Sequence, residues 1–277
     1  MANRLNTAAL RQLLGELKPP LEALRDVLVI DCHGHLGPHS NYYVADDDVR
    51  GIIQVMDAVG INLLCANALC AVEGDYRAGN DMTAAAVRQH PDRLIGHGCI
   101  NPNYPEDMAA ELTRCFEQLG LKVMKLHCGW HHKPADDPAY RPAVEYAASR
   151  GIPLLAHLHD YRAGAKGYAE LAKQFPETSF IVAHASEPNA MDTVLEHCAP
   201  VENVYFDITG YPMFRQSIER LVAGAGADRV LFGSDIAWLN LPYELGAVLY
   251  ARISDEEREK ILGLNMARIL KLPSPLA

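Results

Sequence analysis

The stretch VLVIDCHGHLG at residues 27–37 changes from four apolar residues to an aspartate and then to two histidines separated by one glycine. A short apolar run of this kind is typical of a strand that is buried on both faces of a parallel sheet. Side chains alternate along a strand, so His33 and His35 would point the same way. The stretch therefore predicts a buried strand that carries two imidazoles able to share one cation.

Seven further apolar runs follow the first at intervals of about 25–35 residues, the length of one βα unit. With 27–31 they make eight predicted strands, at 61–67, 94–100, 121–127, 152–158, 179–185, 203–209 and 229–235. Helical patterns lie between them, such as 46–60, which begins with aspartates and ends at a glycine, and 105–120, which begins with a proline. We predict an α/β fold, a single (β/α)8 TIM barrel over residues 27–277.

A doubly wound open sheet is the alternative for the same order of strands and helices. The sequence contains neither the GxGxxG fingerprint of dinucleotide-binding sheets nor a GxxxxGK[ST] phosphate loop. The barrel also makes a specific prediction, because barrel enzymes carry their chemistry at the C-terminal ends of the strands.

Residues 1–26 precede the first strand and form a predicted N-terminal helical extension, with leucines along one side of 5–17. This helix would cap the bottom of the barrel or pack in a subunit interface, and the sequence leaves both open. It is too polar for a signal peptide, and no run approaches the roughly 18 apolar residues of a membrane helix. The seven cysteines form no CxxC pair. Free thiols and the lack of a leader predict a cytoplasmic protein.

The net charge of −10 argues against nucleic acid or an anionic membrane as a partner. The charge says nothing about the substrate, and the small-molecule substrate that we expect follows from the candidate site described next.

Residues able to bind a metal or move a proton follow the apolar part of five predicted strands. They are His33 and His35, Lys125 and His127, His157, His184, and Asp235. A buried histidine paired with a backbone carbonyl would explain one such residue, but not a set at matching strand ends. The pattern predicts one site at the C-terminal end of the barrel.

Five motifs resemble the amidohydrolase superfamily, in the branch of metal-dependent TIM-barrel enzymes that includes amino-carboxymuconate-semialdehyde decarboxylase. They are DCHGH at 31–35, KLH at 125–127, AHLH at 156–159, VAHAS at 182–186 and FGSD at 232–235. NVYFDITG at 203–210 and ILGLNMARIL at 261–270 are similar to the seventh strand and the closing helix of that branch. The resemblance covers residues 27–271 and also implies a homodimer.

This resemblance implies that His33, His35, His157 and Asp235 bind one divalent cation, for which zinc is the expected metal. His184 and Asp235 would be the catalytic acid/base residues beside a metal-activated water. The alternative role for His184 is to hold Asp235 in place.

Lys125 stands where binuclear members of the superfamily carry a carboxylated lysine between two metals. A second metal held by a carboxylated Lys125 is therefore the alternative to a single ion. We expect an unmodified Lys125 that binds a substrate carboxylate or pairs with a buried acid. His127 and Trp130 are the other predicted substrate-binding residues.

The site predicts a metal-dependent hydrolase that cleaves an ester, lactone or amide-type bond of a small, carboxylated substrate. The alternative is a non-oxidative decarboxylase of an aromatic or muconate-type carboxylic acid, which would use the same metal ligands. A barrel that binds metal and ligand without turnover, or an assembly protein, is a third interpretation. A full ligand set with an additional acid/base residue exceeds what binding alone requires.

Overall fold

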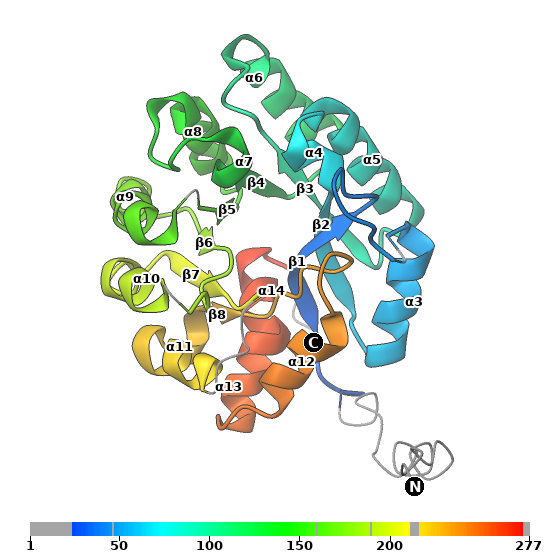
Figure 1. The fold of residues 1–277 in the computed structure, drawn as a ribbon, viewed down its shortest axis with the longest axis vertical. Helices are drawn as coiled ribbons and strands as arrows, with labels where there is room; N and C mark the ends of the chain where they lie inside the picture. The colour runs from blue at the N-terminus through cyan, green and yellow to red at the C-terminus, as the bar shows by residue number, and fades with distance from the viewer. Residues whose placement is uncertain (1–23, 46, 159, 189, 211–215, 274–277) are drawn as a thin grey trace, which may run out of the picture.

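The computed structural model describes residues 24–45, 47–158, 160–188, 190–210 and 216–273. Across them, eight parallel strands form one sheet in which each strand pairs with the next one along the chain, and helices surround it (Figure 1). The strands are β1 (Ile30–Leu36), β2 (Leu63–Ala68), β3 (Leu94–Cys99), β4 (Val123–His127), β5 (Leu154–His157), β6 (Phe180–Val182), β7 (Val204–Asp207) and β8 (Val230–Leu231).

Backbone hydrogen bonds between β1 and the segment after β8 close this sheet into a barrel. The amide of Cys32 donates to the carbonyl of Phe232 at 2.9 Å, and the amide of Asp235 donates to the carbonyl of His33 at 2.7 Å. A parallel bridge joins Gly34 to Ile236. The predicted (β/α)8 barrel is confirmed, and the open sheet is excluded. The predicted extension at 5–17 lies outside the described residues.

The helices also agree with the sequence patterns. Asp48 caps the first of them through a bond from the amide of Gly51 at 2.6 Å, and Gly60 ends it in the left-handed conformation at a φ of 85°. The longer helical segments are α3 (Val49–Val59), α5 (Tyr76–Gln89), α6 (Pro105–Thr113) with η1 (Arg114–Gln118), α8 (Arg141–Arg150), α9 (Tyr161–Lys173), α10 (Met191–Cys198), α11 (Ser217–Ala225) and α12 (Leu241–Leu249). Shorter ones are α4 (Leu69–Glu73), α7 (Cys128–His131), η2 (Pro138–Tyr140), η3 (Ala227–Arg229), α13 (Asp255–Glu259), η4 (Lys260–Leu264) and α14 (Asn265–Ile269).

Three strand boundaries differ from the prediction in ways that matter for the site. β1 begins later than 27–31 and continues to Leu36, so both histidines lie inside the strand. β6 and β8 are shorter than predicted, and His184 and Asp235 follow them in the left-handed region, with φ of 53° and 61°. Left-handed residues leave the extended path of a strand, so neither strand continues through them.

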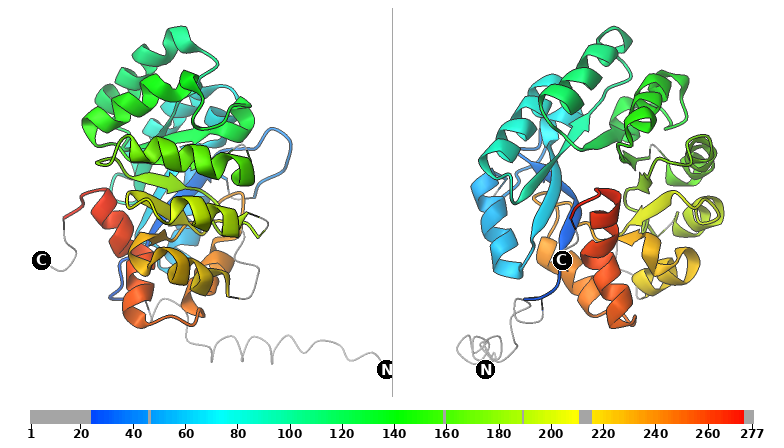
Figure 2. Two further views of the ribbon diagram at one scale, coloured as in Figure 1. Left: turned by 90° about the vertical axis from the view of Figure 1, so that its left-hand side faces the viewer. Right: turned by 180° about the vertical axis from the view of Figure 1, so that it is seen from behind.

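The lower half of the barrel interior is apolar. Ile30, Val123, Leu155 and Ile181 form an inner cluster against Met266 and its neighbours in α14. Figure 2 shows this C-terminal helix, in red, against the end of the barrel. The residues of the predicted site lie toward the opposite end, where the strands finish. Within the described residues no helix is both long and apolar enough to cross a membrane.

The barrel floor should depend on α14. Met266→Ala would leave a cavity beneath the inner cluster, so the free energy of unfolding should fall by about 2–5 kcal/mol. Denaturant unfolding of the two proteins measures this difference. Met82→Ala, which changes a methionine that is 45% exposed, is the control and should shift stability by less than about 0.5 kcal/mol. Equal losses in the two variants would show that α14 does not support the barrel.

Candidate metal centre

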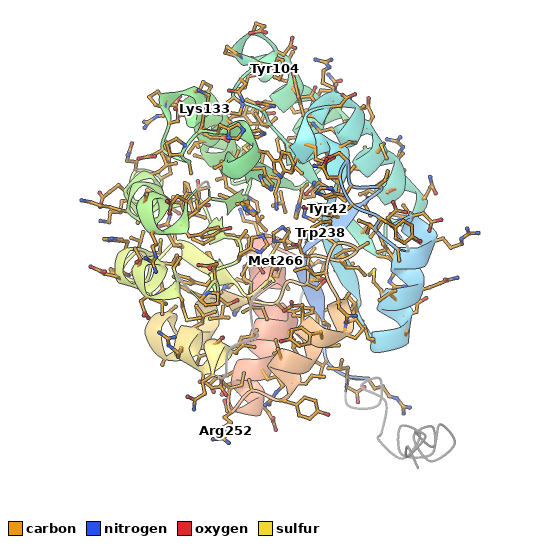
Figure 3. All side chains as sticks on the ribbon, in the orientation of Figure 1. Tyr42, Tyr104, Lys133, Trp238, Arg252 and Met266 are labelled. Atoms are coloured by element: carbon orange, nitrogen blue, oxygen red, sulfur yellow. The ribbon has the colours of Figure 1, made fainter. Side chains whose placement is uncertain are left out.

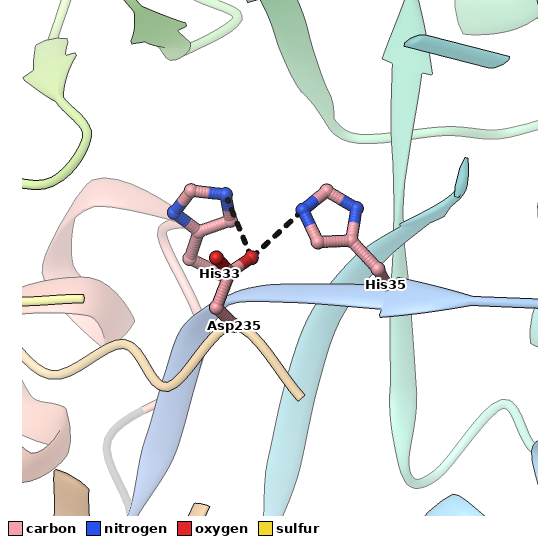
Figure 4. Close-up of side chains that lie close together, drawn as sticks. All are labelled: His33, His35 and Asp235. Carbon is pink, nitrogen blue, oxygen red and sulfur yellow. Dashed lines mark ion pairs between the residues drawn. The ribbon is translucent and has the colours of Figure 1, made fainter. Parts of the chain in front are cut away.

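Three of the predicted ligands converge at the end of the barrel. The ligand atoms of His33, His35 and Asp235 all lie within 4.8 Å of one another, and all three residues are buried. Oδ1 of Asp235 lies 2.9 Å from Nε2 of His35 and 3.7 Å from Nε2 of His33, as Figure 4 shows. Two imidazoles and a carboxylate therefore share one small volume.

A register shift in β1 explains how His33 reaches this volume. The pairing of β1 with β2 slips between Asp31 and Gly34. Strict alternation would send Cys32 and His33 to opposite faces, yet Cys32 packs in the inner apolar cluster and His33 contacts Asp207 of β7 across the barrel. A register shift of this kind is typical of a β-bulge, and it turns the His33 side chain toward His35 and Asp235.

Asp31 holds the chain after β8 against β1. Its Oδ1 accepts the amides of His33 at 3.0 Å and Ser234 at 3.1 Å, and its Oδ2 accepts the hydroxyl of Ser234. Burial raises the pKa of Asp31 to about 8. Asp31 thus positions Asp235, the next residue after Ser234, beside the two histidines. The sequence pattern marked Asp31 only as the end of a strand and did not indicate this role.

Asp207 orients His33. Its Oδ2 lies 2.8 Å from Nδ1 of His33, and a carboxylate can only accept, so Nδ1 carries the proton and Nε2 carries the lone pair. The amide of Thr209 holds the other oxygen, Oδ1, at 2.9 Å. A carboxylate behind a ligand histidine is a common feature of metal sites. Sequence reasoning missed this residue, although an aspartate that ends the buried strand at 203–209 is the signal that could have found it.

Gly233 allows this close packing. A Cβ at residue 233 would lie 2.2 Å from Oδ1 of Asp207 and 2.2 Å from Oγ1 of Thr209. The glycine of the FGSD motif is therefore required by the contact between β7 and the chain that follows β8.

Lys125 contacts the cluster from inside the barrel. Its Nζ lies 2.6 Å from Nε2 of His33, and the residue is 1% exposed. Burial lowers the pKa of this amine. Because Nε2 of His33 accepts from Lys125, His33 would bind a cation only when this hydrogen bond opens. Lys125 is not part of the cavity wall described below, and its predicted contact with a substrate stays a prediction.

His184 lies between the cluster and β5. The centroid of its ring is 5.0 Å from that of His33 and 4.7 Å from that of His157. Nδ1 of His184 lies 3.1 Å from the carbonyl of Thr209, so Nδ1 carries the proton in the neutral ring and Nε2 carries the lone pair. Gly210 packs closely here, since a Cβ at this position would lie 2.9 Å from Nδ1 of His184.

His157 and His127 form a stacked pair, with centroids 4.2 Å apart and planes at 15°. His157 lies outside the group of three whose ligand atoms fall within 4.8 Å, so its role as the fourth ligand stays a prediction. Nδ1 of His127 accepts from the amide of Trp130 at 3.2 Å. The segment after β4 begins with the short helix α7, and this bond caps it.

The cluster fits a divalent metal. Burial lowers the pKa of His33 and of His35, which keeps both rings neutral, the form that binds a cation. Burial alone would raise the pKa of Asp235, but the hydrogen bond from His35, together with the nearby positive charge of Lys125, brings this pKa well below its usual range. Nδ1 of His35 is buried without a hydrogen bond within the described residues and is free to bind a cation. Nitrogen and oxygen donors in this number suit zinc, manganese and similar ions.

A cavity of about 650 Å³ opens on the cluster. Both hydrophobic and polar side chains form its wall, and Tyr42 and Trp238, labelled in Figure 3, lie together at its outer side. The wall consists of His35, His39, Asn41, Tyr42, Leu69, Val72, Glu73, His127, Gly129, Trp130, His157, His184, Gly210, Asp235, Trp238 and Leu239. The predicted substrate-binding residues His127 and Trp130 thus face the same space as His184.

Comparison with known proteins identifies the family of the chain. The family model described as amidohydrolase matches residues 30–272. A 2-amino-3-carboxymuconate-6-semialdehyde decarboxylase of Dictyostelium discoideum is 32% identical over 28% of this chain and 22% of its own length. A gamma-resorcylate decarboxylase of Rhizobium sp. (strain MTP-10005) is 25% identical over 79% of this chain and 86% of its own length.

A solved structure shows the same fold. The dihydroxybenzoic acid decarboxylase of Polaromonas sp. JS666, with bound manganese and the inhibitor 2-nitroresorcinol, aligns with a TM-score of 0.71 at 19% identity, over 89% of this chain and 97% of that one. A divalent metal is supported by the family match and by the buried His–His–Asp cluster. Zinc as the particular metal stays a prediction, because this fold relative holds manganese.

Removal of the Asp207 carboxylate, which accepts a hydrogen bond from Nδ1 of His33, should weaken metal binding. Asp207→Ala frees the imidazole to rotate and lowers its basicity, so affinity for Zn²⁺ or Mn²⁺ should fall roughly 10–100-fold. Calorimetric titration of the metal-free protein with each ion measures the change. Asp192→Ala removes a carboxylate whose side chain is 85% exposed and should leave the affinity unchanged. Unchanged affinity in Asp207→Ala would remove this residue from the site.

Proposed function

The chain belongs to the amidohydrolase family, and on this premise we propose that it catalyses the metal-dependent, non-oxidative decarboxylation of an aromatic carboxylic acid. Two relatives support the reaction class, since both are named as decarboxylases. The prediction of a hydrolase finds no such support, and the decarboxylase, the alternative from the sequence, is the better-supported reading.

The observation that carries the proposal is the cavity beside the cluster. Its aliphatic wall residues Leu69, Val72 and Leu239 and its aromatic residues Trp130 and Trp238 suit a flat, apolar ring. The ligand cluster and His184 lie in the same wall. An aromatic acid could therefore place its carboxylate at the cluster and its ring against the aromatic side chains.

The proposed reaction converts a carboxylate and a proton into an arene and CO2. The bond between the ring and the carboxyl carbon breaks, its electron pair stays on the ring carbon, and a proton joins that carbon. A divalent cation, when bound by His33, His35, Asp235 and the predicted ligand His157, supplies positive charge that holds and orients the acid.

His184 is suited to deliver the proton: as the imidazolium it would give up the proton on Nε2 and remain the neutral ring that is protonated at Nδ1. The carbonyl of Thr209 holds its Nδ1 at 3.1 Å, so proton exchange occurs at Nε2, and the ring lines the cavity. The Trp130 and His127 side chains contact the ring of the acid and keep water away from it.

Hydrolysis is a second candidate because of one feature of Asp235. Asp235 lines the cavity, and its Oδ1, which lies 2.9 Å from Nε2 of His35, could accept a proton from an attacking water. Oδ1 would then serve as a general base.

Product analysis separates the two reactions. The metal-loaded protein, incubated with a panel of hydroxybenzoic acids and with matched benzoate esters and lactones, should release CO2 from at least one acid, with one equivalent of arene per CO2. Mass spectrometry of the arene and a coupled bicarbonate assay measure both products. Ester or lactone cleavage without CO2 release from any acid would establish the hydrolase instead.

His184→Ala should lower kcat for CO2 release by roughly 10²–10⁴-fold, since it removes the proton donor. Metal content should stay unchanged, which distinguishes this effect from loss of the ion. His197→Ala, in α10 and outside the cavity wall, is the control and should retain wild-type kcat. Full activity in His184→Ala would assign proton transfer to another group.

A further inference from the structure

Glu73 brings a carboxylate into the cavity wall at a place that the reaction above does not use. It is the last residue of α4, the short helix that follows β2 directly, and its side chain is only 11% exposed. Asp235 is the other acidic residue of the wall, and it belongs to the ligand cluster. Glu73 does not belong to this cluster.

The partners of Glu73 hold it at the outer part of the cavity. Oε1 accepts the amide and the hydroxyl of Ser40, both at 3.1 Å, and lies 3.3 Å from Nε2 of His39. Nδ1 of His39 accepts from the amide of Asn41 at 3.0 Å, so Nε2 carries the proton of the neutral ring and faces Glu73. His39 in turn stacks on Trp238, with centroids 4.5 Å apart and planes at 22°.

This outer region is open to solvent, in contrast to the cluster. Tyr42 is 61% exposed and Trp130 is 42% exposed, whereas the three clustered ligands are buried. A substrate with its carboxylate at the cluster would therefore direct the far side of its ring toward Glu73. Among the residues that the structure describes, no lysine or arginine lines the cavity to neutralise a second substrate carboxylate there.

Glu73 also retains capacity to accept a hydrogen bond. A carboxylate offers about four acceptor sites. Among the described contacts, Oε2 accepts the amide of Ser40 at 3.3 Å, which is longer than the bonds to Oε1. An uncharged donor on the substrate, such as a hydroxyl or an amino group, would satisfy Oε2. A carboxylate in the same place would face like charge in a partly buried space, which is unfavourable.

We infer that Glu73 is a specificity-determining residue that restricts the cavity to aromatic monocarboxylic acids with an uncharged hydrogen-bond donor on the far side of the ring. This inference rests on the proposed function for the orientation of the acid. It excludes aromatic dicarboxylic acids, whose second carboxylate would lie against Glu73.

Matched pairs of acids test the inference. The probes are 4-hydroxybenzoate against terephthalate and 3-hydroxybenzoate against isophthalate, which differ only in a hydroxyl or a second carboxylate on the ring. Calorimetric binding to the metal-loaded protein should favour the hydroxy acid by roughly tenfold or more in at least one pair. Glu73→Gln keeps the size of the side chain and removes its charge, and it should shrink that preference by about tenfold.

Ser40→Ala is the matched control. It removes the hydroxyl bond to Glu73 but leaves the charge of the cavity unchanged, so the preference for hydroxy acids should persist. If Glu73 only anchors the segment around Ser40, the two variants would shift the preference equally, and the inference would be wrong. Equal or tighter binding of the dicarboxylic acids by the wild-type protein, or binding of none of the four acids, would also overturn it.

Binding and turnover separate this inference from the proposed reaction. A preference that depends on Glu73, without CO2 release from any acid, would support the specificity role and contradict decarboxylation. CO2 release without a preference that depends on Glu73 would support decarboxylation and contradict the specificity role.

Discussion

The buried contact between Asp31 and Ser234 is the constraint on which the site depends. It joins the first strand of the barrel to the segment after the last strand, and both oxygens of the aspartate take part. A buried carboxylate is stable only when its hydrogen bonds are satisfied, so the contact fixes one relative position of the two segments. That position brings Asp235 beside His33 and His35, although some two hundred residues separate them in the chain.

The apolar residues that stabilise the barrel and the residues of the candidate site lie at different levels along the barrel axis. Apolar residues from Ile30 to Met266 fill the lower part, and they pack against one another there. Polar side chains occupy the other end, where Asp207 and Lys125 contact opposite nitrogens of His33. His33 therefore lies at the boundary between the two parts, and its orientation is determined by residues from two other strands.

The sequence was sufficient for the barrel and for the part of the cavity wall that lies at the strand ends, because both follow from local patterns. Eight apolar runs with helical patterns between them predict the fold. Because His35, His184 and Asp235 follow the apolar parts of different strands, the barrel predicts that they lie close together at its C-terminal end, and all three line the cavity. Asp207 and Glu73 were not identified, since their roles depend on contacts with residues far away in the chain. Lys125 was expected to bind a substrate carboxylate or to pair with a buried acid. The strand pattern could not show that its Nζ lies 2.6 Å from Nε2 of His33, and its contact with a substrate stays a prediction. The metal ion, the homodimer and the cytoplasmic location remain predictions.

The position of the metal ion tests the account most directly. Crystals grown without chelator, with diffraction recorded on both sides of the zinc and manganese absorption edges, would locate and identify any bound ion. The account predicts one anomalous peak about 2.0–2.2 Å from a ring nitrogen of His35 and a carboxylate oxygen of Asp235. Catalytically active protein without a peak at His33, His35 and Asp235, or with its only ion bound elsewhere, would contradict it.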